Sequence, residues 1–283
     1  MIAESAAPIV AESLSKRYRG GLLSPRAGAE VVRDVSFTVG EGEVLGLVGA
    51  NGSGKTTTLF LLVGLLRPTS GRSLLLGRDP GDAAVRRALG FLPEAGGVEP
   101  LATPRETLAL RAAAQRLDRR EVTDALERFG LADVADRQLR RCSQGTVRRT
   151  ALAQAAIGAP RLLVLDEPST GLDPDGSRLL EEIVLEAKAR GASVLLTSHV
   201  ALAGVDLCDR LVVLDSGAVA RSGTRAALLD EADVLEARVR GLDGARLGSA
   251  VAAAGGTLED ARPARRDVRH LVSRAGAGRG GAG

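Results

Sequence analysis

The sequence predicts an α/β fold in which a mostly parallel β-sheet is flanked by helices. Three observations lead to this prediction. Short apolar segments alternate with helix-like segments along the chain. A glycine-rich loop at residues 49–54 separates an apolar segment from a helix-like one. Another apolar segment, residues 162–165, ends in two acidic residues, as expected of a buried parallel strand that leads to a ligand crevice.

Composition agrees with one large domain or two smaller ones. The chain has 283 residues, of which 45% are hydrophobic and 2% aromatic, so an aliphatic core is expected. The net charge of +3 is too small to indicate a nucleic-acid partner. The two cysteines form no disulfide framework, and we see neither an export signal nor an apolar run of about 20 residues. We therefore expect a cytosolic chain that relies on another polypeptide for any membrane crossing.

Three short strands are expected first, because partly alternating or apolar runs are bounded by turn residues. They are residues 8–14, 30–38 and 43–48. A helix is expected over residues 55–66. Thr103, Pro104 and Glu106 fit a capping box with proline in the first turn, so a helix should begin there and open a helix-rich stretch to about residue 158.

The second half repeats the strand–helix alternation. A buried strand is expected at residues 160–168, an amphipathic helix at 177–190 closed by Gly191, and another buried strand at 192–199. After about residue 231 the pattern changes, and a small α+β unit is expected.

The glycine-rich loop carries a complete phosphate-binding pattern. Residues 49–56 fit G-x-x-x-x-G-K-[ST] between a strand and a helix, where backbone N–H groups and the helix N-terminus bind an anion. Lys55 would place its charge at the β- and γ-phosphates, and Thr56 would offer its hydroxyl to Mg²⁺. The alternative is a glycine-rich turn that happens to contain one of only three lysines. The residues expected to line the nucleotide phosphates are Gly49, Ala50, Asn51, Gly52, Ser53, Gly54, Lys55, Thr56 and Thr57.

The acidic pair Asp166-Glu167 follows a buried apolar run. At the carboxyl end of a parallel strand, Asp166 could hold Mg²⁺ and Glu167 could polarise an attacking water. The alternative is that the pair caps the next helix. Together with the phosphate loop, the pair indicates a P-loop nucleotide hydrolase. No N-K-x-D stretch is present that would read guanine.

Residues 141–174, RCSQGTVRRTALAQAAIGAPRLLVLDEPSTGLDP, resemble the signature region, acidic motif and following loop of ABC ATPases. The likeness covers roughly residues 8–225, with all motifs in order, and it resembles ATP-binding subunits of bacterial transporters, especially exporters. It implies a P-loop NTPase with a mixed/parallel sheet core, an N-terminal antiparallel β subdomain, and a helical signature subdomain at about 93–158.

The extent of the likeness and the change of pattern after about residue 231 together predict a domain organisation. A nucleotide-binding domain would occupy residues 1–230, and a small α+β accessory domain would occupy residues 231–274. Residues 275–283 would be a disordered tail.

Further site residues are implied by the resemblance alone. Tyr18 would stack on adenine, and His199 would be the switch histidine that holds the γ-phosphate. Asp173 lies in the loop after the acidic motif and would belong to the nucleotide site. Each of the three has a structural alternative. Tyr18 would be a surface residue, His199 a core residue and Asp173 a turn residue.

The signature region departs from the family pattern. Cys142, Gln144 and Thr146 stand where leucine, glycine and glutamine are usual, but Ser143 and Gly145 remain. These two supply a hydroxyl and a close backbone approach, so a working signature is expected.

A second departure lies in the loop at residue 94. Glu94 replaces the usual glutamine. A carboxylate can still contact Mg²⁺ but cannot donate a hydrogen bond.

The resemblance implies ATP and Mg²⁺ as cofactors and a head-to-tail dimer, with itself or with a second ABC ATPase. An integral membrane permease would be the other partner, on the inner face of the cell membrane, and no nucleic acid is expected. The alternative is a soluble ABC ATPase that acts on nucleic acid or ribosomes. Such relatives usually carry long coiled-coil inserts or two domains, whereas roughly 110 residues separate the two motifs here.

Overall fold

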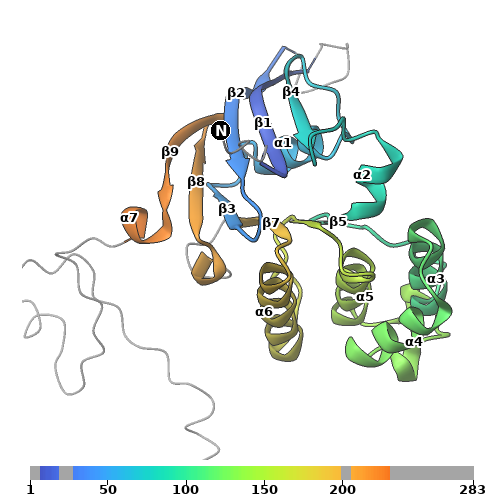
Figure 1. Cartoon of the computed structure of the whole chain (residues 1–283). Helices are drawn as coiled ribbons and strands as arrows, with labels where there is room; N and C mark the ends of the chain where they lie inside the picture. The colour runs from blue at the N-terminus through green and yellow to red at the C-terminus, as the bar shows by residue number, and fades with distance from the viewer. Residues whose placement is uncertain (1–6, 19–27, 199–204, 230–283) are drawn as a thin grey trace, which may run out of the picture. The chain divides into compact units, whose positions relative to one another are not determined.

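The computed structural model describes residues 7–18, 28–198 and 205–229 (Figure 1). His199, the expected accessory domain at 231–274 and the tail at 275–283 lie outside the described residues. The described part contains a three-stranded sheet, a six-stranded sheet and helices on the faces of the larger sheet.

The smaller sheet is antiparallel and has the strand order β2-β1-β4. Its strands are β1 (Ile9–Arg17), β2 (Glu30–Val39) and β4 (Ser70–Leu75). Buried positions such as Ile9, Val35 and Val39 are separated by exposed or half-buried residues, as in a sheet with one covered face. The pairing shifts register near Ser13, whose φ of 47° marks a bulge in β1.

The larger sheet has the strand order β5-β6-β7-β3-β8-β9, and all of its neighbouring strands pair in parallel except β8 and β9, which are antiparallel. Its strands are β3 (Val44–Val48), β5 (Leu89–Leu92), β6 (Leu162–Leu165), β7 (Ser193–Ser198), β8 (Arg210–Asp215) and β9 (Ala218–Thr224). All residues of β6 and β7 are buried, because both faces of the sheet are covered. The carboxyl ends of β3 and β6 therefore flank the end of β7.

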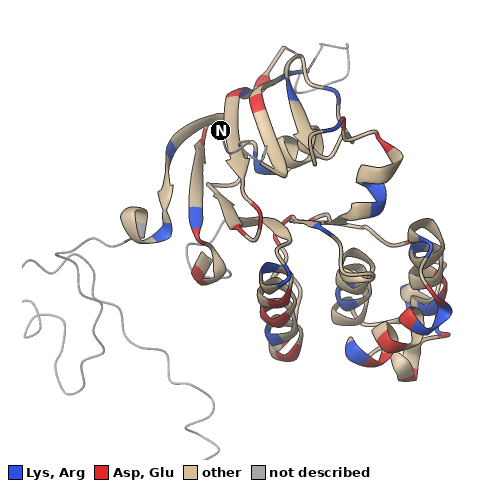
Figure 2. Ribbon diagram, in the orientation of Figure 1, with Lys and Arg blue, Asp and Glu red and all other residues tan. Residues whose placement is uncertain are grey.

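Seven α-helices are described. They are α1 (Lys55–Leu62), α2 (Ala83–Ala88), α3 (Pro104–Gln115), α4 (Arg119–Arg128), α5 (Gln144–Ala156), α6 (Pro174–Ala189) and α7 (Arg225–Leu229). Short 3₁₀ turns lie at residues 132–134, 139–141 and 205–207. Acidic and basic residues are interspersed on α4 and α6, so neither helix presents a surface of one sign (Figure 2).

Two aliphatic clusters, one on each face of the larger sheet, form the core. Leu162 and Val164 of β6 join α1 and the antiparallel sheet in one cluster, whereas Leu163 and Leu165 join α3, α5 and α6 in the other. This period of two sorts neighbouring side chains to opposite faces. The described domain is thus layered as antiparallel sheet, α1, parallel sheet and outer helices (Figure 1).

The expected strands before the phosphate loop, the strand before the acidic pair and the strand after the amphipathic helix are confirmed. The capping box at Thr103 and Glu106 is also confirmed, with both reciprocal hydrogen bonds present. Two helix boundaries were wrong: α1 ends at Leu62 rather than 66, and α6 begins at Pro174 rather than 177.

The sequence did not predict β4, α2, β5, β8 or β9. β5 is four residues long and β4 reads Ser-Gly-Arg-Ser-Leu-Leu, so neither carries a clear local pattern. No helix in the described ranges is long and apolar enough to cross a membrane.

Candidate functional site

The phosphate loop connects β3 to α1 and needs glycine at two positions for different reasons. A Cβ on Gly49 would lie 2.3 Å from the carbonyl oxygen of Leu214 and 2.6 Å from Ser53 Oγ, so a side chain does not fit there. Gly54 precedes α1 with a φ of 101°, which glycine adopts readily. The loop therefore curls tightly into the helix N-terminus, where free N–H groups and the helix dipole favour an anion.

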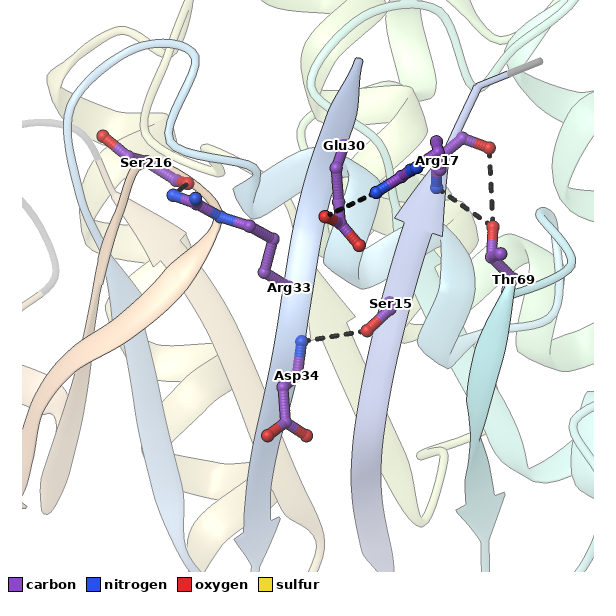
Figure 3. Close-up of polar contacts among 7 residues, drawn as sticks. All are labelled: Ser15, Arg17, Glu30, Arg33, Asp34, Thr69 and Ser216. Carbon is purple, nitrogen blue, oxygen red and sulfur yellow. Dashed lines mark hydrogen bonds and ion pairs between the residues drawn. The ribbon is translucent and has the colours of Figure 1, made fainter. Parts of the chain in front are cut away.

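A turn between β8 and β9 contacts the phosphate loop and holds it in place. The backbone N–H of Gly217 donates to the carbonyl of Ser53 over 3.0 Å, and the N–H of Arg33 on β2 donates to the carbonyl of Gly217 over 2.7 Å. The guanidinium of Arg33 also donates to the carbonyl of Ser216 (Figure 3). The antiparallel sheet thus fixes the phosphate loop through this turn.

Lys55 is the first residue of α1, and only 6% of its side chain is exposed. Its Nζ donates to the carbonyl oxygens of Gly49, at 2.7 Å, and Ala50, at 3.2 Å. The same Nζ lies 3.7 Å from Oε1 of Glu167, whose side chain is equally buried. The phosphate loop and the acidic motif are therefore in direct ionic contact, although Lys55 and Glu167 are 112 positions apart in the sequence.

Asp166 is fully buried at the end of β6. Its Oδ1 accepts a hydrogen bond from Thr197 Oγ1 over 2.6 Å, and its Oδ2 has no hydrogen-bond partner among the described residues. A buried, unpartnered carboxylate oxygen fits a hard cation such as Mg²⁺. In the described ranges no three His, Cys, Asp or Glu side chains form a metal cage, and nucleotide-bound Mg²⁺ needs only one or two protein carboxylates.

The alternative role of Asp166 and Glu167 as a helix cap is wrong. The next helix, α6, begins at Pro174, and its cap is Asp173, whose Oδ1 accepts from the N–H of Gly176 over 2.8 Å. The structure gives Asp173 the role of a helix cap, which is close to the alternative of a turn residue. Its expected place in the nucleotide site stays a prediction.

Glu167 adopts an unusual backbone conformation for a residue with a side chain, with a φ of 46°. Its backbone N–H donates to Thr197 Oγ1 over 2.8 Å, and its carbonyl accepts from the guanidinium of Arg148 over 2.8 Å. Both neighbours are buried. The strained peptide is therefore held from two sides.

Sequence reasoning did not single out Thr197 or Arg148 as site residues. Thr197 had a usable signal, since it is a polar residue near the end of an apolar strand. Arg148 had none, because nothing in the repeated arginines of residues 148–149 indicates that one of them is buried.

Glu94 follows the end of β5 with an exposed side chain. Its backbone carbonyl accepts a hydrogen bond from Arg148 over 3.1 Å, while the N–H of Asp166 donates to the carbonyl of Leu92 over 2.7 Å. The backbone around Glu94 is thus joined to the acidic motif. Its contact with Mg²⁺ stays a prediction.

The signature residues lie at the start of α5. Ser143 is the N-cap, and its Oγ accepts from the N–H of Thr146 over 3.2 Å. A Cβ on Gly145 would meet nothing closer than Ser143 Oγ at 4.0 Å, and a Cβ on Gly171 would lie 3.8 Å from Gln144 Nε2. The signature therefore lies beside the loop that follows the acidic motif, with open space over Gly145.

Tyr18 lies directly after β1, where its backbone pairs with Ala29 and Gly28 over 3.1 Å and 2.9 Å. The Nζ of Lys16 lies 5.5 Å from the centroid of its ring. The neighbouring Arg17 contacts Glu30 and Thr69 and anchors this end of the sheet (Figure 3). The tyrosine is half-buried, and its stacking on a base stays a prediction.

The expected switch histidine, His199, lies outside the described residues, directly after the last residue of β7. That residue, Ser198, is buried and pairs with Val48 of β3. β7 itself thus ends between the phosphate loop and the acidic motif.

Comparisons with known proteins agree with this geometry. A family model described as "ABC transporter" matches residues 32–170. An uncharacterized ABC transporter ATP-binding protein of Nostoc sp. strain PCC 7120 is 37% identical over 227 residues, which cover 78% of this chain and 68% of that protein. The Nod factor export ATP-binding protein I of Rhizobium johnstonii is 37% identical over 217 residues, which cover 75% of this chain and 70% of that protein.

A solved ATP-binding subunit of an ABC transporter has the same fold. It superposes with a TM-score of 0.70 at 30% sequence identity, and the match covers 78% of this chain and 91% of that one. The resemblance inferred from the motifs and the expected fold class are both confirmed.

Proposed function

The chain belongs to the family of ABC transporter ATP-binding proteins, and from this premise we propose that it hydrolyses Mg-ATP to drive a separate membrane permease. The observation that carries the proposal is the contact between Lys55 and Glu167. A phosphate-binding lysine and an acid suited to activating water lie 3.7 Å apart at the carboxyl edge of the parallel sheet. A γ-phosphate that binds beside these two groups and takes over the contact of Lys55 would meet both the charge that binds it and the base that directs water to it.

Each site residue takes a role that follows from its chemistry. The phosphate loop binds the β- and γ-phosphates through backbone N–H groups and Lys55. Thr56, Asp166 and Glu94 would hold Mg²⁺, which supplies positive charge between those phosphates. Glu167 orients and polarises the attacking water, and His199 would hold the γ-phosphate from the end of β7. Tyr18 would stack on the adenine base, an interaction of about 1–3 kcal/mol.

The same nucleotide would join two protomers. Ser143 and Gly145 open the N-terminus of α5, which suits it to meet a γ-phosphate bound by another copy or a second ABC ATPase. Closing a mostly open dimer needs about 5.5 kcal/mol of differential binding. Two γ-phosphates with charge-assisted bonds of about 1.5–3 kcal/mol each supply that amount. ADP lacks the γ-phosphate, so hydrolysis would release the dimer.

We further propose that the permease exports its substrate and that the chain binds it on the cytoplasmic face of the membrane. A relative with 37% identity is named for Nod factor export, which favours this direction. The alternative of a soluble ABC ATPase acting on nucleic acid or ribosomes makes a different prediction. Co-purification with a protein of about six membrane spans supports the transporter, and co-sedimentation with ribosomes or DNA supports the alternative.

The hydrolytic role is tested with Glu167→Gln, which keeps the shape of the side chain but removes its basicity. We expect single-turnover ATP hydrolysis to fall by at least about 100-fold, since general base catalysis contributes roughly 10²–10⁴-fold. ATP binding, measured with a fluorescent analogue, should be retained. The matched control is Glu181→Gln, which makes the same change on the exposed face of α6. A wild-type rate in Glu167→Gln would remove this residue from the mechanism.

A further inference from the structure

We propose that Arg148 is a positioning residue that joins the backbone of Glu167 to the loop at Glu94 and thereby holds Glu167 in the geometry that hydrolysis requires. Arg148 lies on the second turn of α5, the helix that begins with the signature residues. The inference rests on the hydrolytic role proposed for Glu167. It adds a residue that would not touch the nucleotide and would act only through its neighbours.

The guanidinium of Arg148 joins two segments that are far apart in sequence. One terminal nitrogen, Nη1, donates to the carbonyl oxygens of Pro93, at 2.7 Å, and Glu94, at 3.1 Å. The other, Nη2, donates to the carbonyl oxygens of Asp166, at 3.1 Å, and Glu167, at 2.8 Å. The planar fork therefore connects the loop after β5 to the acidic motif after β6, a geometry that a single ammonium cannot reproduce.

The environment of Arg148 makes these contacts costly to replace. The residue is only 7% exposed, and burial lowers the pKa of its guanidinium, whereas the nearby carboxylates of Asp166, Glu94 and Glu167 act in the opposite direction. An arginine in such surroundings remains charged, because the guanidinium is too strong a base to lose its proton in a protein. A buried charge must be well hydrogen-bonded, so the four carbonyls and the guanidinium fix one another.

The position of Glu167 explains why this matters for hydrolysis. With a φ of 46°, its backbone is in the left-handed region, which is unfavourable for a residue that carries a Cβ. Thr197 holds the N–H on one side of this residue and Arg148 holds the carbonyl on the other. A displacement of about 1 Å in a reacting group can lower a rate 100-fold, so loosening one side should reduce hydrolysis without removing any ligand of ATP.

Arg111 provides a matched control. It is a less deeply buried arginine whose guanidinium also donates to backbone carbonyls, those of Arg86 and Leu89, and burial lowers its pKa too. It lies on α3 and contacts the start of β5, at the opposite end of the strand from Glu94. Replacing Arg111 should test the loss of a structural arginine without disturbing Glu167.

The experiment measures single-turnover hydrolysis and ATP affinity of the full-length chain in a double-mutant cycle. Arg148→Gln should lower the hydrolysis rate by about 10- to 100-fold while changing ATP affinity by less than about 3-fold. In the Glu167→Gln background the same substitution should change the residual rate by less than about 3-fold, because both changes act on one group. Arg111→Gln should leave the rate within about 3-fold of wild type even if it lowers the melting temperature.

The outcomes separate this inference from the proposed function. Two results would overturn the inference and leave the proposed function standing. In the first, Glu167→Gln abolishes hydrolysis but Arg148→Gln retains the wild-type rate. In the second, the rate losses of the two single variants multiply in the double variant. If Glu167→Gln hydrolyses ATP at the wild-type rate, the hydrolytic role proposed for Glu167 is overturned, and the inference about Arg148, which rests on that role, is overturned with it. If Arg148→Gln does not fold, Arg148→Lys is read by the same criteria, since it keeps the charge and the aliphatic stem but cannot bridge both segments.

Discussion

The two sheets of this protein use charged side chains in opposite ways. In the antiparallel sheet, ion pairs such as Arg17–Glu30 and Arg72–Glu12 lie at the surface, with at least a third of each side chain exposed. At the carboxyl edge of the parallel sheet, by contrast, the charged residues Lys55, Asp166 and Glu167 are buried.

This difference follows from how each sheet is covered. One face of the antiparallel sheet is open to solvent, whereas helices and the second sheet cover both faces of the parallel one. Water screens the exposed pairs, so each contributes little, while buried groups interact strongly and are costly to leave without a partner. The comparison predicts that equal chemical changes in the two sheets will have unequal effects.

The largest effect is expected for Lys55→Ala. The substitution removes a charged donor that would make at least one bond of about 1.5–3 kcal/mol to ATP, so we expect hydrolysis to fall by at least roughly 10- to 100-fold. The control is Lys188→Ala, which removes a lysine paired with Asp209 at the surface. Steady-state ATPase rates check both variants. Equal rates for the two would show that burial at the sheet edge does not distinguish these lysines.

A matched pair of threonines gives the intermediate effect. Thr197→Val keeps the side-chain shape but removes the hydroxyl that bonds Asp166 and the Glu167 backbone, so unfolding should become easier by about 1–3 kcal/mol. Thr69→Val makes the same change at an exposed position, where the hydroxyl accepts from the N–H of Arg17, and should cost less than about 0.5 kcal/mol. Urea denaturation measures both, and a loss at Thr69 that matches the loss at Thr197 would contradict the comparison.

After the Lys55 and Thr197 variants, the smallest effect of the three is expected for Arg17→Gln. It breaks the ion pair with Glu30 but leaves the backbone bond to Thr69 in place (Figure 3). The free energy of unfolding should change by less than about 1 kcal/mol, and any difference should shrink in 1 M salt, where the Debye length is about 3 Å. Thermal unfolding at low and high salt measures this, and a salt-independent loss would indicate that the pair is not screened as proposed.

The sequence by itself determined the local chemistry of the site. The pattern of residues 49–56 specifies a phosphate loop because glycine, lysine and threonine at that spacing are required by the geometry of anion binding at a helix N-terminus. The acidic pair after an apolar run and the capping box at Thr103 could be interpreted for the same reason: each is complete within a few residues. Family resemblance then placed the motifs in one fold.

Only the tertiary structure decided how these pieces meet. The strand order sets β7 between β6 and β3, so Thr197 bonds the acidic motif while Lys55 contacts Glu167. Arg148 gave no signal, because one buried arginine on a helix looks like an exposed one until distant carbonyls converge on it. Short strands such as β5 were missed for the same physical reason: their stability comes from long-range pairing and burial rather than from local sequence preference.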